Sequence, residues 1–326
     1  MNRKIKVSVI YKRNYNYFKP DHFDRTTSDF FLNALKRHPQ LEMSYYPADD
    51  VFDTKKLIGN TDVILLTNNR TDGTPNELLD IANSDIPVIS RTGDPHHAKK
   101  YDQIKFHQKW KIDYYFGAIP KSYFHKFYPK EFKFKEIIFG LEPEKYKNLK
   151  PFNDRINNKI LNSGAIGKKN LKSRIANSII NPKRSGWYFY KLRTLCNELD
   201  YVDYKGMKGN QYVFKDYPTY LSQYQSAIAA TTFYPTQKYW EIPAAGCLTF
   251  MEITTKNDGK FLGFKDKENS IFINENNYKQ KFQEYLDDPK NSKWKEIANS
   301  GRDYVMKNLT NDNAINSLVD VMNDLI

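Results

Sequence analysis

The 326-residue sequence predicts two α/β domains in tandem, each built on a parallel sheet. Short apolar runs alternate with helical patterns along the chain, which is the order expected when parallel strands are joined by right-handed crossovers. The length is about twice that of an average domain. A polar segment with two prolines, residues 140–154, interrupts the alternation near the middle. We therefore expect domains at residues 1–150 and 151–310, followed by a terminal helix over 311–326.

In the N-terminal half, Val63–Thr67 is apolar throughout, as expected of a strand buried on both faces. A helical stripe of Phe and Leu residues runs from Phe30 to Leu35 and stops at His38-Pro39. A second helix is expected at Asn76–Ser84, because Pro75 just before it is a helix start signal. Further strands are predicted at Lys6–Tyr11, Leu41–Tyr46, Pro87–Ser90, Tyr114–Gly117 and Ile137–Phe139.

In the C-terminal half the same alternation resumes, with helices between the strands and three helices at the end. The last of them, Asn311–Ile326, carries an apolar face that must pack against another element. Strands are predicted at Lys159–Ser163, Val202–Tyr204, Ser226–Ala230, Leu248–Glu252 and Ser270–Ile273.

The composition excludes several classes of protein. No apolar run approaches the roughly 18–20 residues that span a bilayer, and the N-terminus reads as a first strand, so we expect a cytoplasmic location. The two cysteines, Cys196 and Cys247, lack metal or disulfide spacing and are expected to be buried free thiols. The net charge of +13 leaves open a phosphorylated ligand or peripheral association with an anionic membrane. A nucleic-acid partner is disfavoured, because no nucleic-acid motif accompanies the charge.

The stretch from Lys238 to Arg302 carries the most specific pattern. Glu241 opens a short apolar helix that ends in Ala-Ala-Gly, and a strand follows at once. A Glu268-Asn269 turn comes next, and Gly301-Arg302 ends the stretch. This resembles the nucleotide-sugar half of GT-B glycosyltransferases, the "glycosyl transferases group 1" superfamily and particularly its spore-maturation-type branch. The resemblance implies two Rossmann-like domains that face a cleft, with the C-terminal helix crossing back to the N-terminal domain.

The resemblance also implies a donor site in the C-terminal domain. The family's glutamate before Ala-Ala-Gly binds the nucleotide ribose, and Glu241 matches it; the alternative is a helix charge without a ligand. Many retaining members have a second glutamate eight residues earlier, where this chain has Phe233. Thr236 and Lys238 lie where backbone N–H groups, a hydroxyl and an ammonium would hold a diphosphate; the alternative is a simple helix cap.

Two further basic elements are candidates for the diphosphate. One is the turn after strand Lys159–Ser163, which contains Gly164 and is followed by Lys168 and Lys169. A strand, a glycine turn and a helix in this order allow a phosphate to approach the backbone closely. The alternative is a solvated basic helix start. Arg193, in a Tyr-x-Leu-Arg element similar to that of the branch, would clamp phosphate oxygens bidentately, or would be an ordinary surface arginine.

In the N-terminal domain, Asp94 and His96 follow strand Pro87–Ser90, and ligands bind outside the carboxyl ends of such strands. The resemblance implies that this loop faces the cleft and that a histidine touches the transferred sugar. Asn68-Asn69-Arg70, after another strand, is a candidate acceptor contact. No Asp-x-Asp metal motif stands in a suitable loop, so we expect neither a metal nor another cofactor.

The sequence thus predicts a glycosyltransferase that moves a sugar from a nucleoside-diphosphate sugar to a hydroxyl of a glycan, lipid-linked or other acceptor. The resemblance favours a retaining, metal-independent reaction, in which basic groups stabilise the leaving diphosphate. Inversion would make Asp94 or His96 the general base. The alternatives are another GT-B enzyme, such as a nucleotide-sugar epimerase, and a non-catalytic two-domain protein that binds a small ligand.

Overall fold

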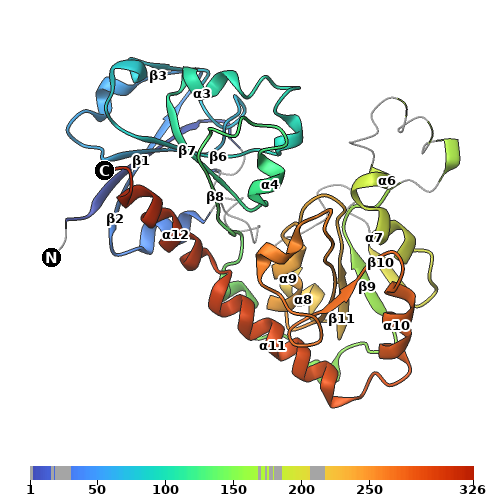
Figure 1. The fold of residues 1–326 in the computed structure, drawn as a ribbon. Coiled ribbons are helices and arrows are strands. Elements are labelled where there is room, and N and C mark those ends of the chain that lie inside the picture. Colours follow the sequence, from blue (N-terminus) through green and yellow to red (C-terminus); the bar gives the residue numbers. More distant parts are fainter. Residues whose placement is uncertain are drawn as a thin grey trace. The chain divides into compact units, whose positions relative to one another are not determined.

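The computed structural model describes residues 3–15, 18, 31–167, 170–172, 175, 179, 186–205 and 217–326. The chain forms two compact units, coloured along the sequence in Figure 1. Unit 1 comprises Met1–Gly140 and Thr310–Ile326, and unit 2 comprises Leu141–Leu309. The first change of unit therefore falls at the beginning of the polar segment 140–154.

Unit 1 is built on a six-stranded parallel sheet of order β2-β1-β4-β6-β7-β8. The chain leaves β1 for β2 on one side of it and later returns to β4 on its other side, so the connections reverse direction between β1 and β4. All four residues of β4 are buried, as its apolar run predicted. The strands are β1 (Ile5–Lys12), β2 (Leu41–Ala48), β4 (Val63–Leu66), β6 (Val88–Arg91), β7 (Ile112–Gly117) and β8 (Phe134–Glu136).

The prediction of a helix at Asn76–Ser84 is wrong. Residues Glu77–Leu79 form a short strand, β5, which pairs in parallel with β3 (Val51–Asp53). Asp80 then adopts a left-handed conformation with φ of 59°, which a helix cannot continue through. Pairing with a segment distant in sequence, which no local pattern reports, decides the structure here.

The last strand of unit 1 lies three residues earlier than the predicted Ile137–Phe139. Strand β8 pairs with β7 from Tyr115 opposite Phe134 to Gly117 opposite Glu136. Because β7 ends at Gly117, residues after Glu136 have no strand to continue pairing with. Ile137 and Phe139 are apolar because they enter the core of unit 1.

The C-terminal helix α12 (Asn311–Asn323), red in Figure 1, packs against α2 (Leu32–Arg37). Ile315, Leu318 and Met322 are fully buried in the core cluster that also contains residues of β1 and β4. The Arg37 guanidinium donates to both carboxylate oxygens of Asp312, at 2.7 and 2.8 Å. Helix α12 therefore completes the core of unit 1, although it is the last element of the chain.

Unit 2 has a five-stranded parallel sheet of order β10-β9-β11-β12-β13. Helices α7 (Lys191–Cys196) and α10 (Tyr278–Leu286) lie on one side of the sheet in Figure 1, and α9 (Lys238–Ala244) lies on the other. Leu192, Phe250 and Phe282 belong to the core between the sheet and helices α7 and α10. The strands are β9 (Ile160–Ser163), β10 (Val202–Lys205), β11 (Ser226–Ala229), β12 (Leu248–Glu252) and β13 (Ile271–Ile273).

The remaining elements connect or flank these sheets. In unit 1 they are α3 (Lys105–Lys109), α4 (Lys121–Phe124) and the 3-10 helices η2 (Thr54–Leu57), η3 (Ile81–Asn83) and η4 (Pro95–His97). In unit 2 they are α6 (Gly186–Phe189), α8 (Tyr217–Leu221), α11 (Ser292–Asn308), η5 (Pro143–Tyr146), η6 (Phe152–Asp154) and η9 (Gly259–Leu262). Among the described residues, no helix combines the length and the apolar character needed to cross a bilayer. Cys196 and Cys247 are buried free thiols, as predicted.

Candidate functional site

The candidate site of unit 2 lies where its chain connections reverse direction. Strand β9 is followed by β10 on one side, and β11 pairs on the other side of β9. Ligands of open parallel sheets bind outside the carboxyl ends of the strands at such a point. The segments that begin there are Gly164–Gly167, after β9, and 230–237, after β11.

Gly164 turns the chain at the end of β9. Its φ is +95°, a conformation in which a glycine has no steric penalty. A Cβ at this position would stand 2.7 Å from Cε of Lys238 and 3.0 Å from Nη2 of Arg193. The Tyr204 hydroxyl donates to the Gly164 carbonyl at 3.0 Å. Two cationic side chains therefore press against the backbone of this turn, and only a glycine leaves room for them.

Arg193, on α7, lies directly behind the turn and is only 1% exposed. Its Nε donates to Oδ1 of Asn162 at 3.1 Å, and its Nη2 donates to the Ser163 carbonyl. The Asn162 amide donates in return to the Arg193 carbonyl at 3.0 Å. Burial lowers the pKa of Arg193. The guanidinium thus positions the turn from within, rather than standing at the surface to clamp phosphate oxygens as the sequence suggested.

Lys238 brings a second cation to the same turn. The sequence pattern predicts a helix that begins at Glu241, after Lys238. In the structure α9 begins three residues earlier, at Lys238, and the preceding Gln237 already has helical φ and ψ angles. The half-buried Nζ donates to the Tyr217 hydroxyl at 2.7 Å and approaches Oγ of Ser163 at 3.3 Å. Burial and the nearby Arg193 lower the pKa of Lys238 to about 8, which Glu241 partly opposes. The group is therefore charged at pH 7 but gives up its proton unusually easily.

Glu241 lies on the same helix, three residues after Lys238, and is 5% exposed. Its charge acts on both Lys238 and the Tyr217 hydroxyl, so it stands close to the cationic turn. One buried carboxylate beside the buried Arg193 and the half-buried Lys238 leaves a local excess of positive charge. This combination suits an anionic ligand with hydroxyl groups, such as a ribose attached to phosphate.

Sequence reasoning missed the tyrosines of this cluster. The buried hydroxyl of Tyr217 bridges Oγ of Ser163, at 2.9 Å, and Nζ of Lys238. Tyr217 and Tyr204 have no motif around them that would have marked them. Thr236 is half-buried, two residues before α9. Lys168 and Lys169, the other two predicted donor-binding residues, lie outside the described residues.

In unit 1, Asp94, His96 and His97 gather after the carboxyl end of β6. Asp94 is exposed and the histidines are half-buried. Nδ1 of His97 is 3.9 Å from Oδ2 of Asp94, and the two imidazole rings are 4.2 Å apart. One ligand atom from each of the three residues lies within 4.8 Å of the others, so the group could also hold a metal ion. The structure thus brings the two predicted catalytic residues, Asp94 and His96, together on one short turn.

The predicted acceptor contacts at Asn68 and Asn69 are occupied within unit 1. Both side chains are almost fully buried. Asn69 donates to the Tyr128 hydroxyl at 2.7 Å and accepts from the Gly93 backbone at 3.0 Å. Asn68 donates to Oδ1 of Asp72 at 3.1 Å. Asn69 shapes the loop that carries Asp94, because it supports the neighbouring Gly93.

Structural comparison places this fold among known proteins. No family model and no curated protein sequence matches the chain. Sucrose-phosphate synthase from Thermosynechococcus elongatus aligns with a TM-score of 0.56 and 11% identity over 99% of both chains. HepE from Anabaena, solved with UDP and glucose, aligns with a TM-score of 0.55 and 10% identity over 98% of this chain and 99% of its own. An α-glucosyltransferase solved with UDP and DNA aligns with a TM-score of 0.53 and 8% identity over 98% of this chain and 99% of its own.

These neighbours share both units with the chain, since the alignments cover almost all of each protein. The two parallel sheets of this chain agree with the two Rossmann-like domains that the resemblance of Lys238–Arg302 implied. The chain therefore has the fold of the GT-B glycosyltransferases.

Proposed function

We propose that this chain is a glycosyltransferase that uses a nucleoside-diphosphate sugar, with the diphosphate bound at the turn formed by Gly164 in unit 2. The observation that carries the proposal is the pair of cations, the buried Arg193 and the half-buried Lys238, packed against this turn at the point where the strand order reverses. Two cations beside a single buried carboxylate, Glu241, leave an excess of positive charge in the free protein, and a diphosphate would offset that cost. UDP in the structures of HepE and the α-glucosyltransferase supports the same ligand class.

In the proposed reaction, the bond between the anomeric carbon and the diphosphate oxygen breaks, and an acceptor hydroxyl oxygen forms the new bond. Lys238 stabilises the charge that develops on the diphosphate, while Arg193 positions the turn and adds to the positive potential. Glu241 holds the ribose. In unit 1, His96 and Asp94 contact the sugar and the acceptor hydroxyl, and the hydroxyl proton passes to the departing diphosphate oxygen.

We further propose that the reaction retains the anomeric configuration and requires neither a metal nor another cofactor, since the cations of unit 2 supply the electrostatic stabilisation. Inversion would instead make Asp94 or His96 the general base. The anomeric configuration of the product, read by NMR, separates these two mechanisms. The acceptor we propose is a hydroxyl of a glycan, lipid-linked or other molecule, and the net charge of +13 would suit a lipid-linked acceptor on an anionic membrane surface.

The test is a thermal-shift panel with UDP, GDP, ADP, TDP and CMP, each with and without magnesium. A ligand at 100 times its Kd adds about 2.7 kcal/mol of stability, which shifts the melting temperature visibly. We expect one nucleoside diphosphate to stabilise the protein equally well without magnesium. Lys238→Met should reduce the shift to half or less, because the variant binds the nucleotide about 10- to 100-fold more weakly. Lys265→Met, at an exposed lysine paired with Glu268, should keep the full shift. No shift with any nucleotide would favour the non-catalytic binding protein instead.

Glu241→Ala separates the ribose role from a helix charge. We expect this variant to bind the nucleotide at least tenfold more weakly, because the ribose hydroxyls lose a charge-assisted partner. Unchanged affinity would end the ribose assignment. Product analysis without an acceptor distinguishes an epimerase, which would interconvert nucleotide sugars under those conditions, from a transferase, which would not.

A further inference from the structure

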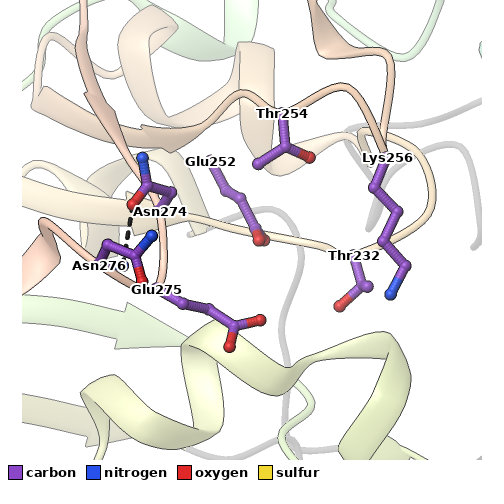
Figure 2. A pocket seen from close by; sticks show the side chains of 7 residues that line it. All are labelled: Thr232, Glu252, Thr254, Lys256, Asn274, Glu275 and Asn276. Carbon is purple, nitrogen blue, oxygen red and sulfur yellow. Dashed lines mark hydrogen bonds between the residues drawn. The ribbon is translucent and has the colours of Figure 1, made fainter.

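A polar pocket lies at the carboxyl ends of the strands of unit 2, two strands away from the Gly164 turn and its cations, Arg193 and Lys238. Its volume is about 290 Å³. It opens between the ends of β12 and β13 and the segment that follows β11, and Figure 2 shows the side chains that surround it. The lining residues are Thr232, Glu252, Thr254, Lys256, Asn274, Glu275 and Asn276.

Glu252, the last residue of β12, is the central group of this pocket. The residue is only 5% exposed, and its backbone carbonyl is fixed by the Tyr239 hydroxyl at 3.0 Å and the Asn257 amide at 2.7 Å. Its carboxyl oxygen Oε2 is buried without a hydrogen-bond partner. In Figure 2 the Glu252 side chain points into the pocket. A buried carboxyl oxygen normally has a partner, so this one calls for an explanation.

Thr232 provides a second buried polar group without a hydrogen-bond partner. This residue follows β11, the neighbour of β12, and is 6% exposed. Its hydroxyl oxygen Oγ1 is also buried without a hydrogen-bond partner. Figure 2 shows the hydroxyl on the opposite side of the same space from the Glu252 carboxyl. Two unpartnered groups from adjacent strands that face one cavity indicate a ligand that offers hydrogen bonds to both.

The other walls of the pocket define the chemistry of that ligand. The Glu275 carboxylate points into the same space and pairs from behind with Lys191 of α7. Lys256 lies over the Phe233 ring, 5.0 Å from its centre. The carboxyl groups of the pocket disfavour an anion, and the two lysines disfavour a free cation. A neutral ligand with several hydroxyl groups satisfies all of these groups, since hydroxyls both donate to carboxylates and accept from threonine and lysine.

The distance from the cationic turn fits a sugar joined to the diphosphate. Strands β9, β11 and β12 are neighbours in that order, and adjacent strands are about 4.8 Å apart, so the ends of β9 and β12 are separated by about 10 Å. Helix α7 also serves both places, because its Arg193 supports the turn while its Lys191 holds Glu275. We propose that this pocket binds the hydroxyl groups of the donor sugar, with Glu252 and Thr232 as the residues that select it. This inference rests on the proposed nucleotide-sugar function.

The experiment compares nucleotide with nucleotide sugar in the full-length protein by isothermal titration calorimetry. The probes are UDP, GDP, UDP-glucose, UDP-galactose, UDP-N-acetylglucosamine and GDP-mannose. We expect the wild-type protein to distinguish among sugars on the same nucleotide. Glu252→Gln and Thr232→Val should each weaken the preferred nucleotide sugar by about tenfold, the effect of one lost hydrogen bond, while leaving the free nucleotide within twofold of wild type. Glu268→Gln, at an exposed carboxylate paired with Lys265, is the control and should change neither.

The outcomes separate this inference from the proposed function. Unchanged sugar preference in both Glu252→Gln and Thr232→Val would overturn the sugar pocket and leave the nucleotide site standing. Loss of free-nucleotide affinity in these variants would also overturn it, because the pocket would then hold the base or ribose. A wild-type protein that binds none of the probes would overturn the proposed function together with this inference. Preserved nucleotide affinity also shows that each variant is folded.

Discussion

Raising the pH from 7 to 9 should weaken UDP binding by about tenfold, because Lys238 loses its proton in this range. Burial and Arg193 lower the pKa of Lys238 from an ordinary 10.5 to about 8. At that pKa, about nine tenths of the side chains are charged at pH 7 and about one tenth at pH 9. A bound diphosphate stabilises the ammonium and raises its pKa well above 9. The free protein must therefore take up a proton before it binds at pH 9.

Proton linkage gives the assay a second readout. At pH 8 half of the Lys238 side chains are neutral, so binding should take up about half a proton per UDP. Calorimetry in two buffers with different ionisation enthalpies measures this uptake directly. Free UDP is the correct probe, since Glu252 also titrates near pH 7 and would complicate data from a nucleotide sugar.

Lys238→Met tests the assignment of that proton. This variant should bind UDP about 10- to 100-fold more weakly at pH 7, the effect of a lost charge-assisted hydrogen bond, and should show no change between pH 7 and 9. Lys265→Met is the matched control and should keep the wild-type profile. A wild-type Kd that does not change with pH, or a proton uptake that persists in Lys238→Met, would refute the role of this lysine.

The lowered pKa of Lys238 also makes the free energy of unfolding of the ligand-free protein depend on pH. The folded state holds the Lys238 proton less tightly than the unfolded state, so the unfolded state binds more protons between pH 8 and 10.5. Lys238 therefore lowers the free energy of unfolding, and this destabilisation is fully present below pH 8. As the pH rises from 8 to 10.5 the destabilisation disappears, so the free energy of unfolding should rise in this window. Urea unfolding of wild type and Lys238→Met at pH 7.5 and 9.5 checks the sign: the stability advantage of the variant should be larger at pH 7.5.

Three further predictions concern other parts of the molecule. Gly164→Ala should lower the free energy of unfolding by about 1–3 kcal/mol. It should also weaken UDP binding, because the new Cβ would displace Lys238. The control is Gly59→Ala, whose φ is +78° but whose Cβ would have open space, so that urea unfolding should show the backbone strain alone. Leu318→Ala should cost about 2–5 kcal/mol, because this fully buried side chain of α12 leaves a cavity in the core of unit 1, and an unchanged urea midpoint would contradict the packing. His96→Ala should lower kcat in a transfer assay and leave the Kd of UDP unchanged, since it belongs to unit 1; a loss of UDP affinity would speak against that role.

The sequence predicted the sheets well because their strands are local patterns. A strand buried on both faces must be apolar throughout, as Val63–Leu66 is, and this requirement is visible in a few consecutive residues. The pattern around Glu241 likewise placed a short helix between two strands of unit 2. The helix expected at Asn76–Ser84 was wrong because β5 exists only through its pairing with β3, about 25 residues away along the chain.

What the tertiary structure alone decided is the environment of each polar group. The sequence marked Gly164, Arg193, Lys238 and Glu241 as donor-binding candidates, but it could not show that Arg193 is buried behind the turn or that Tyr217 joins Ser163 to Lys238. Nor could it show that Glu252 is left with an unpartnered carboxyl oxygen. Burial, partners and pKa values depend on residues that are distant in sequence and meet only when the strands are stacked in order. Residue type and spacing therefore determine which groups are available, and the packing of the sheet determines what each of them can do.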